Sequence, residues 1–170
     1  MNQIKGSEER TLIIFRLSLS VFIAGLILSG LTAFPLLYEL SLLCRWLGIS
    51  DPAGYEFLSG IRRWLAFVFF GLQKTYAAFP FVGYGTDWLG FGHFIIALFF
   101  IGPFRNPIRN AWVLRCGLAA CGAVIPLALI CGYVRQIPLP WRLFDCSFGV
   151  LGAVLLLYCL HLTKKLSRAR

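Results

Sequence analysis

Four long apolar stretches, each with basic residues near an end, constrain this chain more than any other feature of its sequence. They lie at about 11–33, 86–104, 111–133 and 142–162, and about 20 apolar residues are enough for a helix to cross a bilayer. Only 14% of the 170 residues are charged, against about 25% in a soluble domain, and the mean hydropathy is +0.78. We therefore predict an all-α integral membrane protein with four transmembrane helices, in which residues 1–170 form a single membrane domain.

The first apolar stretch has a second interpretation. Lys5, Arg10 and Arg16 lie at its beginning, and a basic flank before an apolar segment is also typical of a secretory signal peptide. The residues LTAF at its end make a poor cleavage site, because Leu31 interrupts the pattern of small residues that cleavage requires. The sequence therefore favours an uncleaved transmembrane helix.

The segment 34–85 differs from the four stretches because it mixes apolar residues with charges and turn signals. Apolar residues at helical spacing predict an amphipathic helix within it; these residues are Leu58, Ile61, Leu65, Val68 and Leu72. We predict one or two helices lying at the extracytoplasmic surface of the membrane. The alternative is a fifth transmembrane helix over 57–79, but Arg62, Arg63 and Lys74 leave only about ten uninterrupted apolar residues, too few to span.

The distribution of basic residues predicts how the chain is oriented. Ten of the 16 Lys and Arg residues fall on the side that holds both termini: Lys5, Arg10, Arg16, Arg105, Arg109, Arg115, Lys164, Lys165, Arg168 and Arg170. The other six are Arg45, Arg62, Arg63, Lys74, Arg135 and Arg142. Because basic residues concentrate on the cytoplasmic side, we predict cytoplasmic termini and a multi-pass protein of the bacterial inner (plasma) membrane. The net charge of +9 then meets anionic lipid, so the bilayer is a predicted partner and nucleic acid is not.

Small residues one helical turn apart are placed to let helices approach closely in lipid. The pairs are Gly25 with Ser29, Gly117 with Cys121, and Gly149 with Ala153. Packing inside the monomer is one use of such pairs, and contact with a membrane-protein partner or a second copy is the other. The leading functional hypothesis is accordingly a non-enzymatic accessory or assembly subunit that acts through helix packing.

A polar cluster is expected in the outer leaflet. Asp87 and His93 lie early in the second span, and Arg142 and Asp145 begin the fourth span from the same side. Ionisable residues inside a membrane usually face the protein interior and pair, so these four form a hypothetical ligand-binding site. It supports two alternative functions, a small-molecule or quinone-binding membrane protein and an oligomeric transporter. A structural interpretation makes Arg142 and Asp145 a helix-end pair, Asp87 a helix cap and His93 a residue bonded to a backbone carbonyl.

The connection between the second and third spans carries Arg105 and Arg109, which are hypothetical ligands for lipid headgroups or only topological anchors. Cys131 and Cys146 flank the next connection at similar depth, so an oxidising compartment would permit a disulfide between them. Packing as a small apolar residue is the other role open to each cysteine.

No catalytic residue, metal site or cofactor is predicted. His93 and His161 are the only two histidines, and most of the bilayer separates them, so they do not ligate one haem. No C-x-x-C motif occurs, which argues against a thiol-disulfide oxidoreductase. These absences favour a protein without enzymatic activity.

The stretch from Phe79 to Cys159 contains FPFVGYGTDWLGFGHFIIALFFIGPFRNPIRNAWV, IPLALICG and IPLPWRLFDCSFGV. In these residues the chain resembles a family of uncharacterised small bacterial four-helix inner-membrane proteins with no established activity. The resemblance covers roughly half the chain, and it implies a bacterial membrane protein and no particular reaction. A looser likeness to four-helix DoxX-type proteins lies in RRWLAFVFFGLQK, and it would require that segment to span the membrane.

Overall fold

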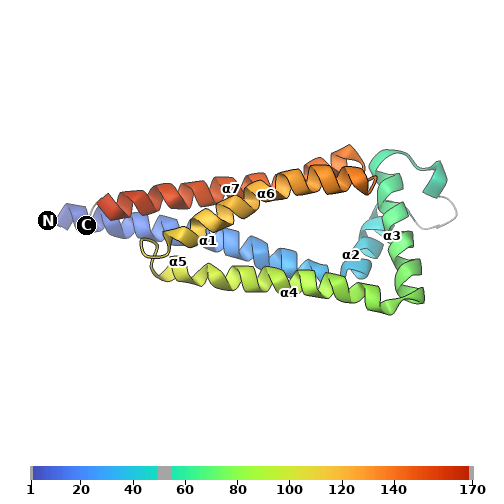
Figure 1. Cartoon of the computed structure of the whole chain (residues 1–170), viewed down its shortest axis with the longest axis horizontal. Helices are drawn as coiled ribbons and strands as arrows, with labels where there is room; N and C mark the ends of the chain where they lie inside the picture. The colour runs from blue at the N-terminus through green and yellow to red at the C-terminus, as the bar shows by residue number, and fades with distance from the viewer. Residues whose placement is uncertain (1, 50–54, 169–170) are drawn as a thin grey trace. The chain divides into compact units, whose positions relative to one another are not determined.

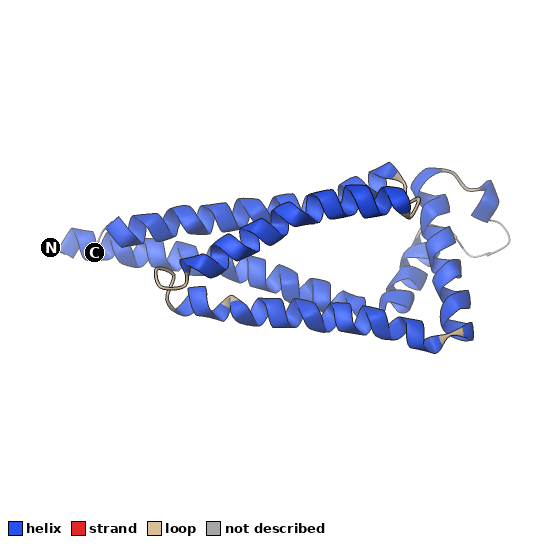
Figure 2. Cartoon of the chain, viewed as in Figure 1, coloured by secondary structure: helices blue, strands red, loops and turns tan. Residues whose placement is uncertain are grey.

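The computed structural model describes residues 2–49 and 55–168, and every regular element in these residues is helical (Figure 1, Figure 2). The α-helices are α1 (Asn2–Ala33), α2 (Leu36–Trp46), α3 (Gly60–Ala78), α4 (Gly83–Phe99), α5 (Ile101–Arg105), α6 (Ala111–Val134) and α7 (Leu139–Arg168). Two short 3-10 helices, η1 (Tyr55–Phe57) and η2 (Pro80–Val82), precede α3 and α4. The prediction of an all-α fold is confirmed for the described residues.

Four helical segments of the described chain are long and apolar enough to cross a membrane: Gly6–Ala33, Pro80–Arg105, Ala111–Val134 and Leu139–Arg168. The predicted number of candidate spans is therefore confirmed. The 19-residue helix α3 is not among them, because Arg62, Arg63 and Lys74 interrupt its apolar residues. Its length and composition favour the amphipathic interpretation of this segment over a fifth span.

Several helices are longer than the predicted spans. α1 begins at Asn2 and α7 continues to Arg168, whereas the spans were expected to start near 11 and to end near 162. Helical hydrogen bonds join residues four apart, so a helix continues into flanking Glu, Arg, Lys and Leu residues, which are good helix formers. Hydropathy predicts the apolar length of a span and not the residues at which its helix begins and ends.

The chain forms two compact units. Unit 1 comprises residues 1–26 and 96–170, and unit 2 comprises residues 27–95. The division falls within α1 and within α4. The assignment of 1–170 to a single membrane domain stays a prediction.

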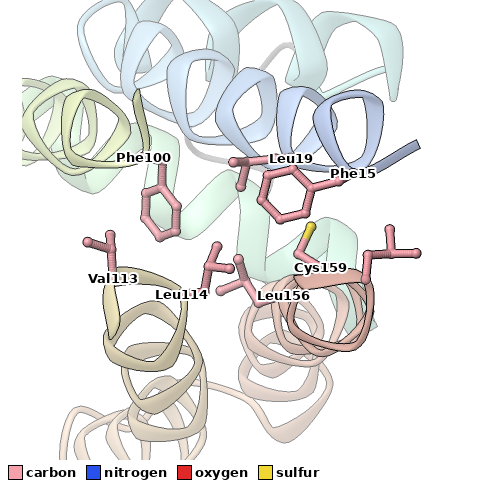
Figure 3. Packing of buried hydrophobic residues seen from close by; sticks show 8 residues of the cluster. Phe15, Leu19, Phe100, Val113, Leu114, Leu156 and Cys159 are labelled. Atoms are coloured by element: carbon pink, nitrogen blue, oxygen red, sulfur yellow. The ribbon is translucent and has the colours of Figure 1, made fainter. Parts of the chain in front are cut away.

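Apolar side chains from α1, α6 and α7, together with Phe100 between α4 and α5, form the core of unit 1 (Figure 3). The cluster contains Phe15, Leu19, Phe100, Val113, Leu114, Leu156, Cys159 and Leu162. Phe15 and Leu19 lie one turn apart on α1, and both are fully buried. Phe22, on the next turn, meets the ring of Phe100 edge to face at a centroid distance of 4.8 Å. This stripe at helical spacing places the first half of α1 against the α6–α7 hairpin.

Glycines bring α6 and α7 into close contact along the hairpin, the most extensive pairing of elements in the structure. A Cβ atom at Gly149 of α7 would lie 2.6 Å from the backbone oxygen of Cys121 on α6. A Cβ atom at Gly117 of α6 would lie 2.6 Å from the ring of Phe100 and 2.9 Å from Leu156. Gly149 therefore requires glycine, because backbone cannot move aside, whereas a larger residue at Gly117 would have to displace the ends of two side chains; such close contacts are expected where helices pack in lipid without a hydrophobic driving force.

A tight turn joins α6 to α7. The Ile137 N–H donates to the Gly132 oxygen at 2.8 Å, and the Gln136 N–H donates to the Tyr133 oxygen at 3.0 Å. These two bonds form a Schellman motif, which satisfies the last carbonyl groups of α6. The motif places Gln136 at a φ of 57°, a left-handed conformation that favours glycine.

In unit 2, the end of α1 crosses α4 at a pair of glycines. A Cβ atom at Gly30 would lie 2.9 Å from the backbone oxygen of Gly90, and one at Gly90 would lie 2.8 Å from the oxygen of Gly30. The rings of Phe34 and Phe94 stack beside this crossing at a centroid distance of 6.0 Å. Within the same unit, α3 runs across the direction of α4 rather than along it (Figure 1).

Helices α2 and α3 enclose a small second core in unit 2, made of Cys44, Ile49, Ala66 and Phe70. α2 ends in a Schellman motif in which Gly48 has a φ of 70° and the Ile49 N–H donates to the Cys44 oxygen at 2.8 Å. Arg62 of α3 donates from Nη2 to the Leu47 oxygen at 2.8 Å. Hydrogen bonds at the end of α2 thus hold this pair of helices together with their apolar contact.

Candidate functional site

The four residues predicted to form a polar site are divided equally between the two units. Asp87 and His93 lie on α4 in unit 2, and Arg142 and Asp145 lie on α7 in unit 1. The structure therefore describes the surroundings of each residue within its own unit. A single site made of all four stays a prediction.

His93 lies beside the glycine crossing of α1 and α4. Its Cβ atom is 3.1 Å from the position that a Cβ atom on Gly30 would take. Its Nδ1 atom is 2.7 Å from the backbone oxygen of Leu89, one turn earlier on α4. A hydrogen bond to the residue's own helix, at a close helix crossing, is the arrangement that the structural interpretation expects.

Asp87 is not at the beginning of its helix. α4 begins at Gly83, so Asp87 lies within the helix, and the interpretation of Asp87 as a helix cap is wrong. The Thr86 hydroxyl instead donates to the Gly83 oxygen at 2.7 Å. The η2 turn enters the helix directly and makes the earlier start possible.

Arg142 joins α7 to α6. Its side-chain carbons lie against Gly132, where no other residue would leave room for them. Nη1 donates to the Leu129 oxygen at 3.3 Å, and Cζ lies 5.9 Å from the centroid of the Tyr133 ring, within the range of a cation–π contact. Nε is buried and has no hydrogen-bond partner. These contacts run to α6 rather than along α7 to Asp145, so Arg142 stabilises the hairpin.

Asp145 is half-buried near the amino end of α7, and its neighbour Cys146 is buried. The Cys146 thiol points toward the Ile125 oxygen at 3.9 Å. All six cysteines are free in the structure, Cys131 and Cys146 included. Within the described residues, no group of three or more His, Cys, Asp or Glu side chains is placed to hold a metal ion.

Arg105, one of the two predicted headgroup ligands, lines a small depression of about 200 Å³ in unit 1. Glu8 and Glu9 of α1 line the same depression, with Leu12, Asn106, Pro107, Ile108 and Leu166. The two carboxylates supply negative charge beside Arg105. Arg109 does not line this depression; its backbone N–H donates to the Asn106 side chain at 3.1 Å.

A second and larger depression of unit 1 lies between α6 and α7 and has a volume of about 420 Å³. Its polar lining includes Arg115 of α6 and His161, Lys164 and Ser167 of α7. From the sequence, Arg115 and Lys164 were expected only to orient the spans, and His161 was considered only as a haem ligand and rejected. Their positions in the sequence could have predicted this proximity. Arg115 and His161 are at similar distances along the chain from the α6–α7 turn, so an antiparallel hairpin brings them to the same level.

Comparisons of the chain with known protein families, curated proteins and solved structures found no match. The geometry of the two units therefore carries the functional argument.

Proposed function

We propose that the chain is a small non-enzymatic, multi-pass membrane protein that acts as an accessory or assembly subunit by packing α1 against a partner membrane protein. The main observation in support of this proposal is that Gly25, a small residue of α1, is left uncovered. Apart from the neighbouring backbone of α1 itself, no atom of the described residues lies within 4 Å of the position that a Cβ atom on Gly25 would take. Ser29, one turn further along α1, is also exposed.

The other two small-residue pairs are used inside the protein. Gly117 packs against Phe100 and Leu156, and Gly149 packs against Cys121 and Val124. Residues of the same kind therefore have different surroundings on α1 and on the hairpin. This contrast supports an external partner for the face of α1 that carries Gly25.

The energetics of a helix in lipid support the same proposal. Glycine destabilises a helix interior by about 1 kcal/mol relative to alanine, and exposure to lipid tails does not compensate for that loss. Close approach of a second helix does compensate, because it adds dispersion contacts between backbones. Leu17 and Val21, two turns and one turn before Gly25, are 63% and 60% exposed. Only 11% of the apolar window of α1 is buried, the smallest share among the four candidate spans.

The proposal includes a location and an orientation. We place the protein in a bacterial inner membrane with both termini in the cytoplasm and segment 34–85 outside. The excess of basic residues near the termini supports this orientation. So does the arrangement of unit 1, in which the amino end of α1 and the carboxyl end of α7 lie at the same end (Figure 1).

Co-purification from native membranes tests the accessory role. We expect the tagged chain to retain a second membrane protein in a fixed ratio, and Gly25→Leu to lose it without a fall in the amount of protein. Ala123→Leu is the matched control, because it adds similar bulk to an exposed position of α6. A chain that retains no stoichiometric partner would contradict the proposal, as would equal retention by both variants. Light scattering identifies the case in which the partner is a second copy.

The alternative, a ligand site at the outer polar residues, depends on Asp145. Asp145 is a half-buried carboxyl in an apolar helix that the local packing described above does not explain, and Asp87 of α4 is half-buried as well. Asp145→Ala and His93→Ala, made singly, test it. The ligand hypothesis fails if both variants accumulate and the cells behave as wild type under every condition that affects a full deletion.

A further inference from the structure

Both basic and apolar residues line the depression between α6 and α7. Its lining consists of Ile108, Ala111, Arg115, Leu157, Leu160, His161, Thr163, Lys164 and Ser167. We propose that it binds the phosphate-bearing headgroup of an anionic phospholipid. All of these residues belong to unit 1, and lipid binding here does not depend on the accessory role proposed for α1.

The polar residues that line the depression are suited to binding a phosphate. Arg115 comes from α6, while His161 and Lys164 lie one turn apart on α7, and all three side chains are exposed. An arginine donates two parallel hydrogen bonds to phosphate oxygens, and a lysine adds a mobile positive charge. Among the residues that the structure describes, no Asp or Glu lines the depression. Positive groups from two helices therefore converge on a volume in which this lining supplies no compensating charge.

The amino end of α6 adds a further preference for an anion. α6 begins at Ala111, which lines the depression. The side chain of its N-cap residue, Asn110, makes no capping bond and instead donates to the Gly102 and Asn106 oxygens. The Ala111 and Val113 N–H groups already donate to the Ile108 and Asn110 oxygens, so the contribution of this helix end is the positive end of its dipole, beside the depression that Ala111 lines.

One face of α7 leads from an apolar surface into the basic depression. Val150, Val154 and Leu157 are all exposed on α7 at intervals of four and three residues. His161 and Lys164 continue the same spacing, so the five side chains form one stripe along the helix. An acyl chain on the apolar part and a phosphate on the basic part match a phospholipid. A soluble anion would use the basic part alone.

A comparison with the neighbouring, smaller depression explains why the larger one is the better candidate for a lipid phosphate. Ile108 lines both, but the smaller depression places Glu8 and Glu9 with Arg105. There the protein supplies its own negative charge beside the basic residue. In the larger depression a lipid phosphate would supply it.

Lipid binding to purified protein tests the proposal. Native mass spectrometry after delipidation and titration with phosphatidylglycerol or phosphatidylcholine measures the preference directly. We expect wild type to prefer phosphatidylglycerol, and R115Q/K164Q to bind it at least about tenfold more weakly, because each basic residue near a membrane surface contributes on the order of 1 kcal/mol. K165Q/R168Q is the control, because it removes the same charge from the same region at residues that do not line the depression.

A second variant tests the same depression independently, in case R115Q/K164Q does not fold. Ser167 is exposed and lines the depression, so Ser167→Trp obstructs it without removing a charge. We expect this variant to melt as wild type does and to lose the lipid preference. Equal phosphatidylglycerol binding by wild type, R115Q/K164Q and Ser167→Trp would overturn the proposal, whichever residues bind the lipid instead.

Inorganic phosphate distinguishes the lipid from a soluble anion. We expect millimolar phosphate to leave phosphatidylglycerol bound, because it lacks the acyl contact with α7. Displacement by phosphate, together with equal affinity for the two lipids, would assign the depression to a soluble anion and contradict a phospholipid site.

Discussion

The α6–α7 hairpin of unit 1 and the α2–α3 pair of unit 2 are held together by different means. The hairpin relies on glycines that let backbones touch and on large apolar side chains fitted around them. The α2–α3 pair relies on a small apolar cluster together with a capped helix end and the Arg62 hydrogen bond. The difference is the one expected if lipid surrounds the first pair and the membrane–water interface surrounds the second.

The physical reason is the solvent, lipid or water, that surrounds each side chain before it is buried. Lipid tails are as apolar as leucine, so burying leucine between transmembrane helices gains little transfer free energy, and steric fit decides the packing. At an interface, burying an apolar side chain removes it from water and gains roughly 25 cal/mol per Å². Substitutions that add bulk should therefore do most damage in the hairpin, and substitutions that remove apolar atoms should do most damage between α2 and α3.

The largest effect is expected from Gly149→Leu. Its Cβ atom would meet the Cys121 backbone oxygen at 2.6 Å, and backbone cannot move aside as a flexible side chain can, so we expect a loss of about 3 kcal/mol or more. The measurement is the fraction of folded monomer in detergent as temperature rises. Gly122→Leu is the matched control, since nothing lies within 4 Å of its Cβ position. Equal losses for the two variants would show that bulk anywhere on these helices is harmful.

Phe70→Ala should be the most damaging truncation in the α2–α3 cluster, at about 3 kcal/mol. Cys44 provides a local readout, because it is 1% exposed and burial raises the pKa of its thiol above the usual 9.0. Both effects slow its reaction with maleimide. We expect Cys44 labelling to accelerate at least about tenfold in Phe70→Ala at constant pH, which corresponds to local opening that is easier by about 1.4 kcal/mol or more. Unchanged labelling would contradict the role given to this cluster.

Leu156→Ala tests the same kind of truncation in the core of unit 1, for comparison with Phe70→Ala in the α2–α3 cluster. Leu156 is fully buried in the core of unit 1, and in a soluble core this change costs about 2–5 kcal/mol. In lipid the transfer part of that cost is largely absent, so we expect only the lost packing contacts, about 1–2 kcal/mol. Steric trapping in bicelles measures it. A loss equal to that of a soluble core would argue that water, rather than lipid, is the reference solvent.

The smallest effect is expected at the α6–α7 turn. Gln136 adopts a φ of 57°, which costs a non-glycine residue about 1 kcal/mol or more, while glycine adds about 0.5–1 kcal/mol of unfolded-state entropy. Gln136→Gly should therefore stabilise the hairpin by about 0.5 kcal/mol, seen as a slightly higher melting temperature. Gln136→Ala should show no such increase, since alanine keeps the strained conformation.

Hydropathy was sufficient to predict helices and four candidate spans, because twenty apolar residues in a row have few other stable arrangements. It did not predict where helices end. α1 starts at Asn2, because local hydrogen bonding continues through polar residues that favour helix.

Tertiary relations were less accessible from the sequence. The same small-residue pattern occurs around Gly25 and around Gly149, yet only the second is packed in this chain. The contacts of Arg142 with α6, and the convergence of Arg115 with His161, depend on the register of the hairpin. Spacing along one helix carries no information about that register, which is why the basic depression was missed.

The number of membrane crossings is the central claim, and the location of the two chain ends tests it most directly. Reporter fusions at Met1 and at Arg170, each active in only one compartment, determine on which side each end lies. Four crossings predict that both ends give the cytoplasmic signal, with α3 at the surface. Ends in opposite compartments would mean an odd number of crossings, with α3 as the obvious fifth, and would contradict the account.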